Sequence, residues 1–255
     1  MAQTILLIFV ITCVGTAIMV YTLGPLVIWI TQKIPTIVKF TPVPGSDFLL
    51  NRNAKFYHYH DSLLESGFTY LNSSEFSVGA GKSFFSLYVH YGLQIAAMVA
   101  TVKSLHMEIS YIEISQRYKD GTSLSVYNSN QPSVYPLMDF KLEFRYPKIF
   151  DVGELIDIHQ RLRDKYKKGI PVIAYDKSDA FSDAESSIFE ESEELCKRGI
   201  CHQEIDSNGM RKLTLKGAYM MSYRCIFPGT MICSYLGEKR SLKALEDACF
   251  FRTKF

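Results

Sequence analysis

The chain opens with a long run of apolar residues and then changes to shorter alternating patterns of polar and apolar positions. No charged side chain occurs in residues 1–32. Taken as a helix, the stretch Ile5–Ile30 is about 39 Å long at about 1.5 Å per residue, which exceeds the roughly 30 Å hydrocarbon core of a bilayer. The pattern predicts a transmembrane anchor over residues 1–32, formed by the apolar side chains of Ile5, Leu6, Leu7, Phe9, Val10, Ile18, Val20, Leu23, Val27 and Trp29.

A cleaved signal peptide and a buried soluble helix are the alternatives for this segment. A signal peptide needs a basic start and an apolar core of about 7–15 residues. The first basic residue is Lys33 and the apolar run is longer, so this alternative fits less well. A soluble helix of this length would carry charge on one face. Basic residues follow the segment, beginning with Lys33 and Lys39, and none precedes it. The positive-inside rule therefore predicts an outside N-terminus and a cytoplasmic domain.

The residues after the anchor predict a linker and then a strand-rich domain. Residues 33–60 contain three prolines and Gly45, which disfavour long helices, so a linker is expected there. The soluble domain is expected over residues 61–210, with a short helix capped at Asp61. Runs rich in aromatic and β-branched residues predict strands over 83–90, 93–102, 107–118, 122–127 and 141–146.

Two local signals refine this strand prediction. Asp120-Gly121 favours positive φ and predicts a tight hairpin between two of the strands. The alternation slips between Tyr111 and Ile112, which indicates either a bulge or a strand buried on both faces.

Helices are predicted in the second half of the domain. Asp151 caps a helix that runs to about Lys167, where Gly169 ends it, and an acidic helix covers about 182–197. A short strand is expected over 170–175. The order of elements predicts an α+β fold, with an N-terminal transmembrane helix and a soluble domain that has a mainly antiparallel sheet and two to three helices.

The C-terminal segment 211–255 combines apolar and basic residues. A second membrane span over 213–236 is disfavoured, because Arg224 would lie near its centre at a cost of about 2.5–3.5 kcal/mol. A core helix followed by a buried strand is one interpretation. The other is an interfacial segment that meets the bilayer surface through Tyr219, Met220, Tyr223, Arg224, Phe227, Lys239 and Arg240.

Charge and cysteine content exclude some classes of function. The formal net charge of +2 is too small for a strongly basic nucleic-acid-binding protein, so no nucleic-acid partner is expected. Six scattered cysteines suit a reducing cytosol, although Cys196 and Cys201 could pair if the domain were extracytoplasmic. The spacing of Cys196, Cys201 and His202 is not that of a structural zinc site, and no metal is expected.

No motif supports catalysis or a cofactor. The glycine-rich stretch 77–83 resembles the end of a phosphate-binding loop but has Phe76 where the first glycine belongs, so a turn is expected. His58 and His60 are placed on one side of an extended segment without an identifiable third ligand. His159 is expected as a satisfied histidine at the boundary of the core. We therefore predict no catalytic, cofactor-binding or metal-ligating residue and no cofactor.

Three short motifs carry a family resemblance. They are Arg117–Leu124, the helix with His159-Gln160-Arg161-Leu162, and Lys216-Gly217-Ala218. On these residues the chain resembles bacterial single-pass membrane proteins with no assigned function. The resemblance implies an inner-membrane location and no particular activity.

These observations lead to three hypotheses about function. The first is a non-enzymatic interaction module, tethered to membrane lipid and acting as an accessory or assembly subunit with a membrane-protein partner. The alternative is a membrane-associated enzyme that acts on a lipid or small molecule through His58, His60 or Cys201. A pocket where a histidine converges with a carboxylate or thiol would distinguish the enzyme. A lipid-sensing domain that works through residues 211–243 is a third option.

Overall fold

The computed structural model describes residues 2–40, 49–50, 52–78, 81–104, 107–175 and 181–252. Within these ranges it contains six helices and nine strands. They form two compact units. Unit 1 comprises residues 1–38, 133–136 and 185–233, and unit 2 comprises residues 39–132, 137–184 and 234–255. Two helices, α4 (Ser182–Lys197) and α6 (Gly229–Arg252), contribute residues to both units.

Unit 2 is built on a six-stranded sheet with the order β2-β3-β4-β5-β6-β7. Neighbouring strands are antiparallel except for β6 and β7, which are parallel. The strands are β2 (Thr69–Val78), β3 (Gly81–His90), β4 (Ile95–Ser104), β5 (Met107–Arg117), β6 (Ser123–Tyr127) and β7 (Lys141–Arg145). The expected α+β class with a mainly antiparallel sheet is confirmed.

The core of unit 2 lies between one face of this sheet and the helices α2 (Ala54–Glu65) and α3 (Val152–Tyr166). α2 contributes Tyr59 and Leu63, and α3 contributes Leu155 and Leu162, each at most 1% exposed. Burying one such side chain stabilises the fold by about 1.5–3 kcal/mol. As predicted, Asp151 caps α3: its side chain accepts a hydrogen bond from the Glu154 amide at 2.7 Å.

The predicted turn between β5 and β6 is confirmed. Gly121 has a φ of +80°, and Asp120 Oδ1 accepts a hydrogen bond from the Thr122 amide at 3.0 Å. The bulge considered near Tyr111 does not form, because β4 and β5 pair in continuous register. β5 instead keeps a regular alternation, with every second residue from Ser110 to Gln116 buried.

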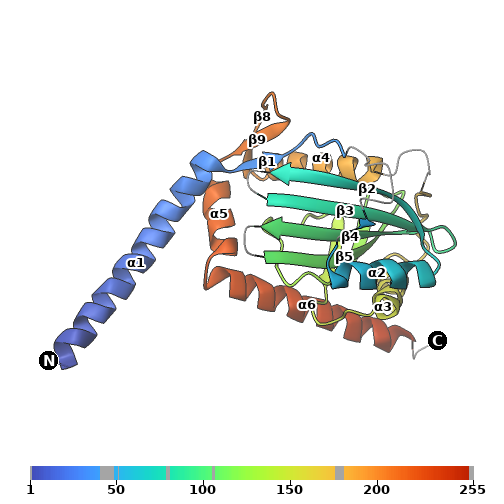
Figure 1. Ribbon diagram of the computed structural model, residues 1–255, viewed down its shortest axis with the longest axis horizontal. Coiled ribbons are helices and arrows are strands. Elements are labelled where there is room, and N and C mark those ends of the chain that lie inside the picture. The colour runs from blue at the N-terminus through green and yellow to red at the C-terminus, as the bar shows by residue number, and fades with distance from the viewer. Residues whose placement is uncertain are drawn as a thin grey trace. The chain divides into compact units, whose positions relative to one another are not determined.

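Unit 1 joins the apolar helix to a small sheet. α1 (Ala2–Thr31) leads into β1 (Lys33–Pro35), which pairs with β9 (Met210–Leu213), and β9 pairs with β8 (Cys201–Ile205). The Gly209 carbonyl accepts hydrogen bonds from the amides of Thr36 and Ile37, both at 2.9 Å. α5 (Leu215–Cys225) follows β9 and lies beside the C-terminal part of α1 (Figure 1).

Residues 33–60, expected as a linker, contain β1 and more than half of α2. α2 starts at Ala54 because the Asn53 side chain accepts a hydrogen bond from the Phe56 amide at 2.9 Å. The helix expected to start at Asp61 therefore begins earlier, and His58 and His60 are helical instead of extended. Of the segment 33–60, Pro42, Pro44 and Gly45 lie outside the described residues.

Other differences concern elements with weak sequence patterns. β2 was not predicted because it is polar, yet Ser73 is fully buried and its hydroxyl lies 2.7 Å from that of Ser86. The strand expected over 170–175 is reduced to a single bridge between Tyr118 and Val172. Residues 79–80 of the glycine-rich stretch lie outside the described part of the chain.

The C-terminal segment also differs from the expectation of a helix followed by a buried strand. It forms β9 and then the two helices α5 and α6. With these, the described residues hold six helices, more than the anchor and the two or three predicted for the domain.

Candidate functional site

The helix α1 presents the largest apolar surface of unit 1. From Gln3 to Val20 every described side chain is exposed. The ten side chains predicted to form the anchor are between 37% and 64% exposed. By length and composition, the part Gln3–Thr31 is the one described helix able to cross a membrane. No other described helix or strand of unit 1 packs on this surface before Tyr21.

From Tyr21 onward, one face of α1 packs against α5. The face consists of Tyr21, Gly24, Pro25 and Ile28, which follow helical spacing and are partly or fully buried. The Tyr21 hydroxyl donates a hydrogen bond to the Phe227 carbonyl. A Cβ atom on Gly24 would lie 3.5 Å from Ser222 Oγ and 3.6 Å from the Ile226 side chain, so the two helices approach closely there.

Local chemistry determines where α5 begins and which face it buries. The Thr214 hydroxyl caps the helix by accepting a hydrogen bond from the Gly217 amide at 3.1 Å. A Cβ atom on Gly217 would lie 2.1 Å from the Ile200 carbonyl oxygen, so only glycine permits this approach. Ala218 and Ser222 are buried, and the opposite face points away from the unit.

The exposed face of α5 carries two of the predicted membrane-contact residues, Tyr219 and Tyr223, and a third, Phe227, follows the helix. Tyr219, Tyr223 and Phe227 are 47%, 44% and 68% exposed and are spaced four residues apart. Met220 is half-buried. Arg224 is partly buried, because its Nη1 donates hydrogen bonds to the carbonyls of Ser133 and Tyr135 at 3.1 and 3.0 Å.

The two remaining predicted contact residues, Lys239 and Arg240, belong to unit 2. Both are exposed; Lys239 Nζ lies 6.0 Å from the Tyr235 ring centroid, and Arg240 donates a hydrogen bond to the Glu143 carbonyl. The sequence predicted Lys239 and Arg240 to lie in one membrane-surface segment with Tyr219 and Tyr223. In the structure these two tyrosines belong to unit 1.

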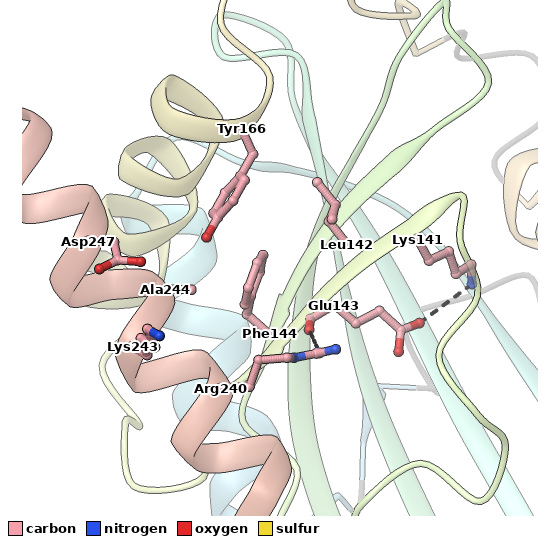
Figure 2. Close-up of a pocket in the computed structure, with 9 residues that line it drawn as sticks. All are labelled: Lys141, Leu142, Glu143, Phe144, Tyr166, Arg240, Lys243, Ala244 and Asp247. Atoms are coloured by element: carbon pink, nitrogen blue, oxygen red, sulfur yellow. Dashed lines mark hydrogen bonds and ion pairs between the residues drawn. The ribbon is translucent and has the colours of Figure 1, made fainter.

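Arg240 lines an open pocket of about 350 Å³ in unit 2 (Figure 2). Phe144 and Tyr166 stack at its floor with ring centroids 5.6 Å apart. Its charged groups largely pair within the protein, as Lys141 does with Glu143 at 4.0 Å and Asp247 with Lys165 at 3.1 Å. The other lining residues are Leu142, Lys243 and Ala244. The pocket offers an aromatic floor and a mixed-charge rim, without a histidine or thiol among its lining residues.

The sulfur-containing cluster of unit 1 lies where α4 ends and β8 begins. The sulfur atoms of Cys196 and Cys201 are 2.7 Å apart. The Arg211 guanidinium lies 3.0 Å from the Cys196 sulfur, and it also forms an ion pair with Glu193. Burial, followed by the hydrogen bond and charge of Cys196, raises the pKa of the Cys201 thiol to about 12. His202, the third member of the predicted cluster, is exposed.

The histidines proposed for catalysis do not meet a carboxylate or a thiol in the contacts described. His58 is exposed on α2. His60 Nδ1 lies 2.7 Å from the hydroxyl of the buried Tyr88, within a group of aromatic rings. His159 is fully buried instead of lying at the boundary, and neither ring nitrogen has a hydrogen-bond partner among the described atoms.

No group of three or more metal-ligating side chains occurs among the residues that the structure describes. Sequence reasoning missed the role of Arg211 beside Cys196. Gly199 was a local signal that Cys196 and Cys201 come together, because it reverses the chain between them with a φ of +70°.

Comparison of the chain with models of protein families, with curated proteins and with solved structures finds no match.

Proposed function

We propose that the chain is a membrane-tethered interaction module, in which α1 crosses the bilayer and the rest of the chain works at its surface. The observation that carries this proposal is that every described side chain from Gln3 to Val20, most of them apolar, is exposed. Exposing one large apolar side chain to water costs about 1.5–3 kcal/mol when it is fully exposed. Ten such residues, each about half exposed, would together cost roughly 7–15 kcal/mol, as much as the whole stability of a typical domain, roughly 5–15 kcal/mol. Hydrocarbon removes that cost.

The length of the uncovered part of α1 supports the same proposal. Residues 2–20, at about 1.5 Å per residue, span about 28 Å, close to the roughly 30 Å thickness of the hydrocarbon core. Packing against α5 begins at Tyr21, where the headgroup region would begin. Tyr21, Tyr219 and Tyr223 then lie in the zone that tyrosine and tryptophan prefer in membrane proteins.

The orientation follows from the basic residues after α1. Lys33 and Lys39 favour the cytoplasmic side for the residues that follow the helix, with the N-terminus outside. Lys33 Nζ lies 2.6 Å from Asp206 Oδ2, which connects this end of α1 to the small sheet of unit 1. A bacterial inner membrane is the setting proposed for this arrangement.

The role of accessory or assembly subunit rests on the surfaces that the protein offers. Gly15 in α1 has no atom within 4 Å of a Cβ built on it, so a helix of a membrane-protein partner has room to pack there. The contacts of His58, His60 and Cys201 described above include no paired histidine and carboxylate, which favours the interaction module over the enzyme.

Fluorescence of Trp29, the one tryptophan in the sequence, tests membrane insertion. The full chain is reconstituted into vesicles whose lipids carry bromine atoms at different depths. Trp29 lies about 12 Å beyond Tyr21 along α1, so we expect bromines close to the headgroups to quench it weakly and bromines at the bilayer centre to leave it unquenched. Intact chain that remains soluble and monodisperse without detergent would contradict the proposal.

A matched pair of variants separates insertion from nonspecific adhesion. Leu7→Arg with Ile11→Arg places two charges in the middle of the uncovered part of α1, at about 2.5–3.5 kcal/mol each. The control, Ile37→Arg with Leu64→Arg, changes two exposed apolar residues outside α1. We expect alkaline carbonate to extract the first variant from membranes and to leave the control in the pellet.

Chemical cross-linking in native membranes followed by mild detergent extraction tests the accessory role. We expect the chain to be recovered in a complex with a membrane protein, and we expect Gly15→Leu to reduce that recovery. Recovery as a monomer alone would count against the interaction module and would leave the test of membrane insertion unaffected.

A further inference from the structure

The two cysteines at the end of α4 are brought together by a short reversal of the chain. Cys196 lies in the last turn of α4, and Gly199 takes a φ of +70°. The Ile200 amide then donates a hydrogen bond to the Leu195 carbonyl at 2.9 Å, and Cys201 starts β8. This path leaves the two sulfur atoms 2.7 Å apart. A disulfide bond is about 2.05 Å long, so small side-chain movements suffice to form one.

The two thiols differ in accessibility. Cys201 is 3% exposed, and its sulfur lies 3.6 Å from the Ser192 carbonyl oxygen. Cys196 is only half-buried, and its sulfur lies 3.1 Å from the His202 carbonyl oxygen. A reagent in solution can therefore reach Cys196 first, while Cys201 is placed to react only with Cys196.

A buried arginine lies against the accessible sulfur. Arg211 is 4% exposed, and its Nη1 lies 3.0 Å from Cys196 Sγ and 3.2 Å from the Ser192 carbonyl oxygen. Its Nε has no hydrogen-bond partner among the described atoms. A guanidinium in this position stabilises negative charge that develops on the Cys196 sulfur during a reaction. Burial of Arg211 keeps this interaction strong, because water screens it little.

We propose that Cys196 and Cys201 form a thiol–disulfide exchange site that takes an external disulfide as its oxidant. The Cys196 thiolate attacks one sulfur of that disulfide, and the other sulfur leaves as a thiolate. Cys201 then loses its proton and attacks Cys196 in the mixed disulfide, which releases the second external thiolate. Overall, two cysteine thiols are oxidised by two electrons, one external disulfide is reduced, and the two protons go to the released thiolates.

The site does not depend on the proposed membrane anchoring, and it suits either side of a membrane. In a reducing cytosol a disulfide of this kind is transient and serves catalysis or redox sensing, whereas in an oxidising compartment it persists. β9, which carries Arg211, pairs with β1 so that Arg211 lies opposite Ile34, just after the end of α1. The exchange site is therefore connected through one strand pair to the end of the apolar helix.

Oxidation of the full chain in detergent tests this site. The reduced protein is equilibrated with glutathione buffers of rising potential, quenched with acid, alkylated and digested. We expect Cys196 and Cys201 to become protected together and a cross-linked peptide to appear, while Cys225, Cys233 and Cys249 remain alkylated. A second experiment uses an oxidised dithiol protein in place of glutathione, and it distinguishes a small disulfide from a protein disulfide as the source. Failure of both oxidants to produce the cross-link would overturn the proposal.

Variants identify the order of events. Cys201→Ser should accumulate a mixed disulfide of one glutathione on Cys196, whereas Cys196→Ser should leave Cys201 unmodified. Arg211→Lys should slow formation of the mixed disulfide about tenfold, as expected for one lost charge-assisted hydrogen bond, while Cys225→Ser should not change it. Equal modification of Cys196 and Cys225 by glutathione would also refute the site.

Discussion

The hydroxyl of Tyr21 in α1 donates a hydrogen bond to the backbone carbonyl of Phe227, two residues after the end of α5 and 206 positions away in the sequence. Gly24 extends the same contact, since it faces Ser222 and Ile226. Whatever surrounds the chain at Tyr21 therefore also meets the corner after α5, where Phe227 is 68% exposed. If α1 crosses a bilayer, this corner is carried to the bilayer surface with it.

The close approach at Gly24 makes a first prediction. Gly24→Leu would force a branched side chain between α1 and α5, and overpacking of this kind costs about 1–3 kcal/mol. Gly15→Leu is the matched control, because nothing lies within 4 Å of a Cβ at that position. We expect thermal unfolding in detergent, followed by circular dichroism, to occur at lower temperature for the first variant only. Equal transitions would show that α1 and α5 do not pack through Gly24.

The buried His159 makes the stability of unit 2 dependent on pH. Burial lowers the pKa of His159 to about 4, and the charge of Arg163 adds to this shift. The unfolded chain, with an ordinary histidine pKa of about 6.5, binds the proton more readily. Stability from this group is thus fully present above about pH 6.5 and is lost as the pH falls toward 4, by about 3 kcal/mol in total.

His159→Leu tests this dependence, because it removes the titrating group from the core. Urea unfolding at pH 7 and pH 4.5 should show that the wild-type chain loses about 2–3 kcal/mol more than the variant between the two conditions. His58→Leu changes an exposed histidine and should retain the wild-type difference. The same loss in all three proteins would assign the effect to other groups.

Asn128 connects three parts of unit 2 through its side chain. It donates to the Tyr59 hydroxyl and to the Ile149 carbonyl and accepts from the Ile112 amide, each at 2.9 Å. Asn128→Ala leaves buried groups unpaired at about 1–3 kcal/mol each. Asn130→Ala, at an exposed position, should change the free energy of unfolding by less than about 0.5 kcal/mol. Chemical denaturation of both variants measures the difference, and similar values would contradict the network.

Arg145 holds a loop and a helix of unit 2 together. Arg145 is only 4% exposed, and its guanidinium donates hydrogen bonds to the carbonyls of Ser129, Asn130 and Ser234, the last at 2.7 Å. Arg145→Met removes these bonds, and we expect a loss of about 2–4 kcal/mol in the free energy of unfolding. Arg163→Met removes a more exposed arginine that pairs with its neighbour Asp164, and it should cost at most about 1 kcal/mol. Equal losses would show that the Arg145 bonds contribute little.

Elements with strong local signals were predictable from the sequence. α1 followed from the missing charges, α3 from the cap at Asp151, and the β5–β6 turn from Asp120-Gly121. Each of these depends on interactions within a few residues, so neighbouring residues suffice to specify it. The start of α2 was also encoded locally, by the Asn53 cap, but the pattern around His58 and His60 was interpreted as an extended segment.

Elements and sites made by distant residues were not predictable in the same way. The polar strand β2 lacks an apolar period, and the hydroxyl of its buried Ser73 lies 2.7 Å from the hydroxyl of Ser86 in the next strand. Hydrogen-bond partners of this kind are known only after the strands pair.

The sequence by itself determined that one long helix is apolar enough to cross a membrane, because that property depends only on composition and length. Only the tertiary structure decided which face of that helix packs on α5, and that Arg211 lies beside Cys196 and Cys201. Those contacts join residues that are distant in the chain, and their chemistry depends on distances of a few ångströms. The pattern of apolar and polar positions in the sequence does not specify such distances.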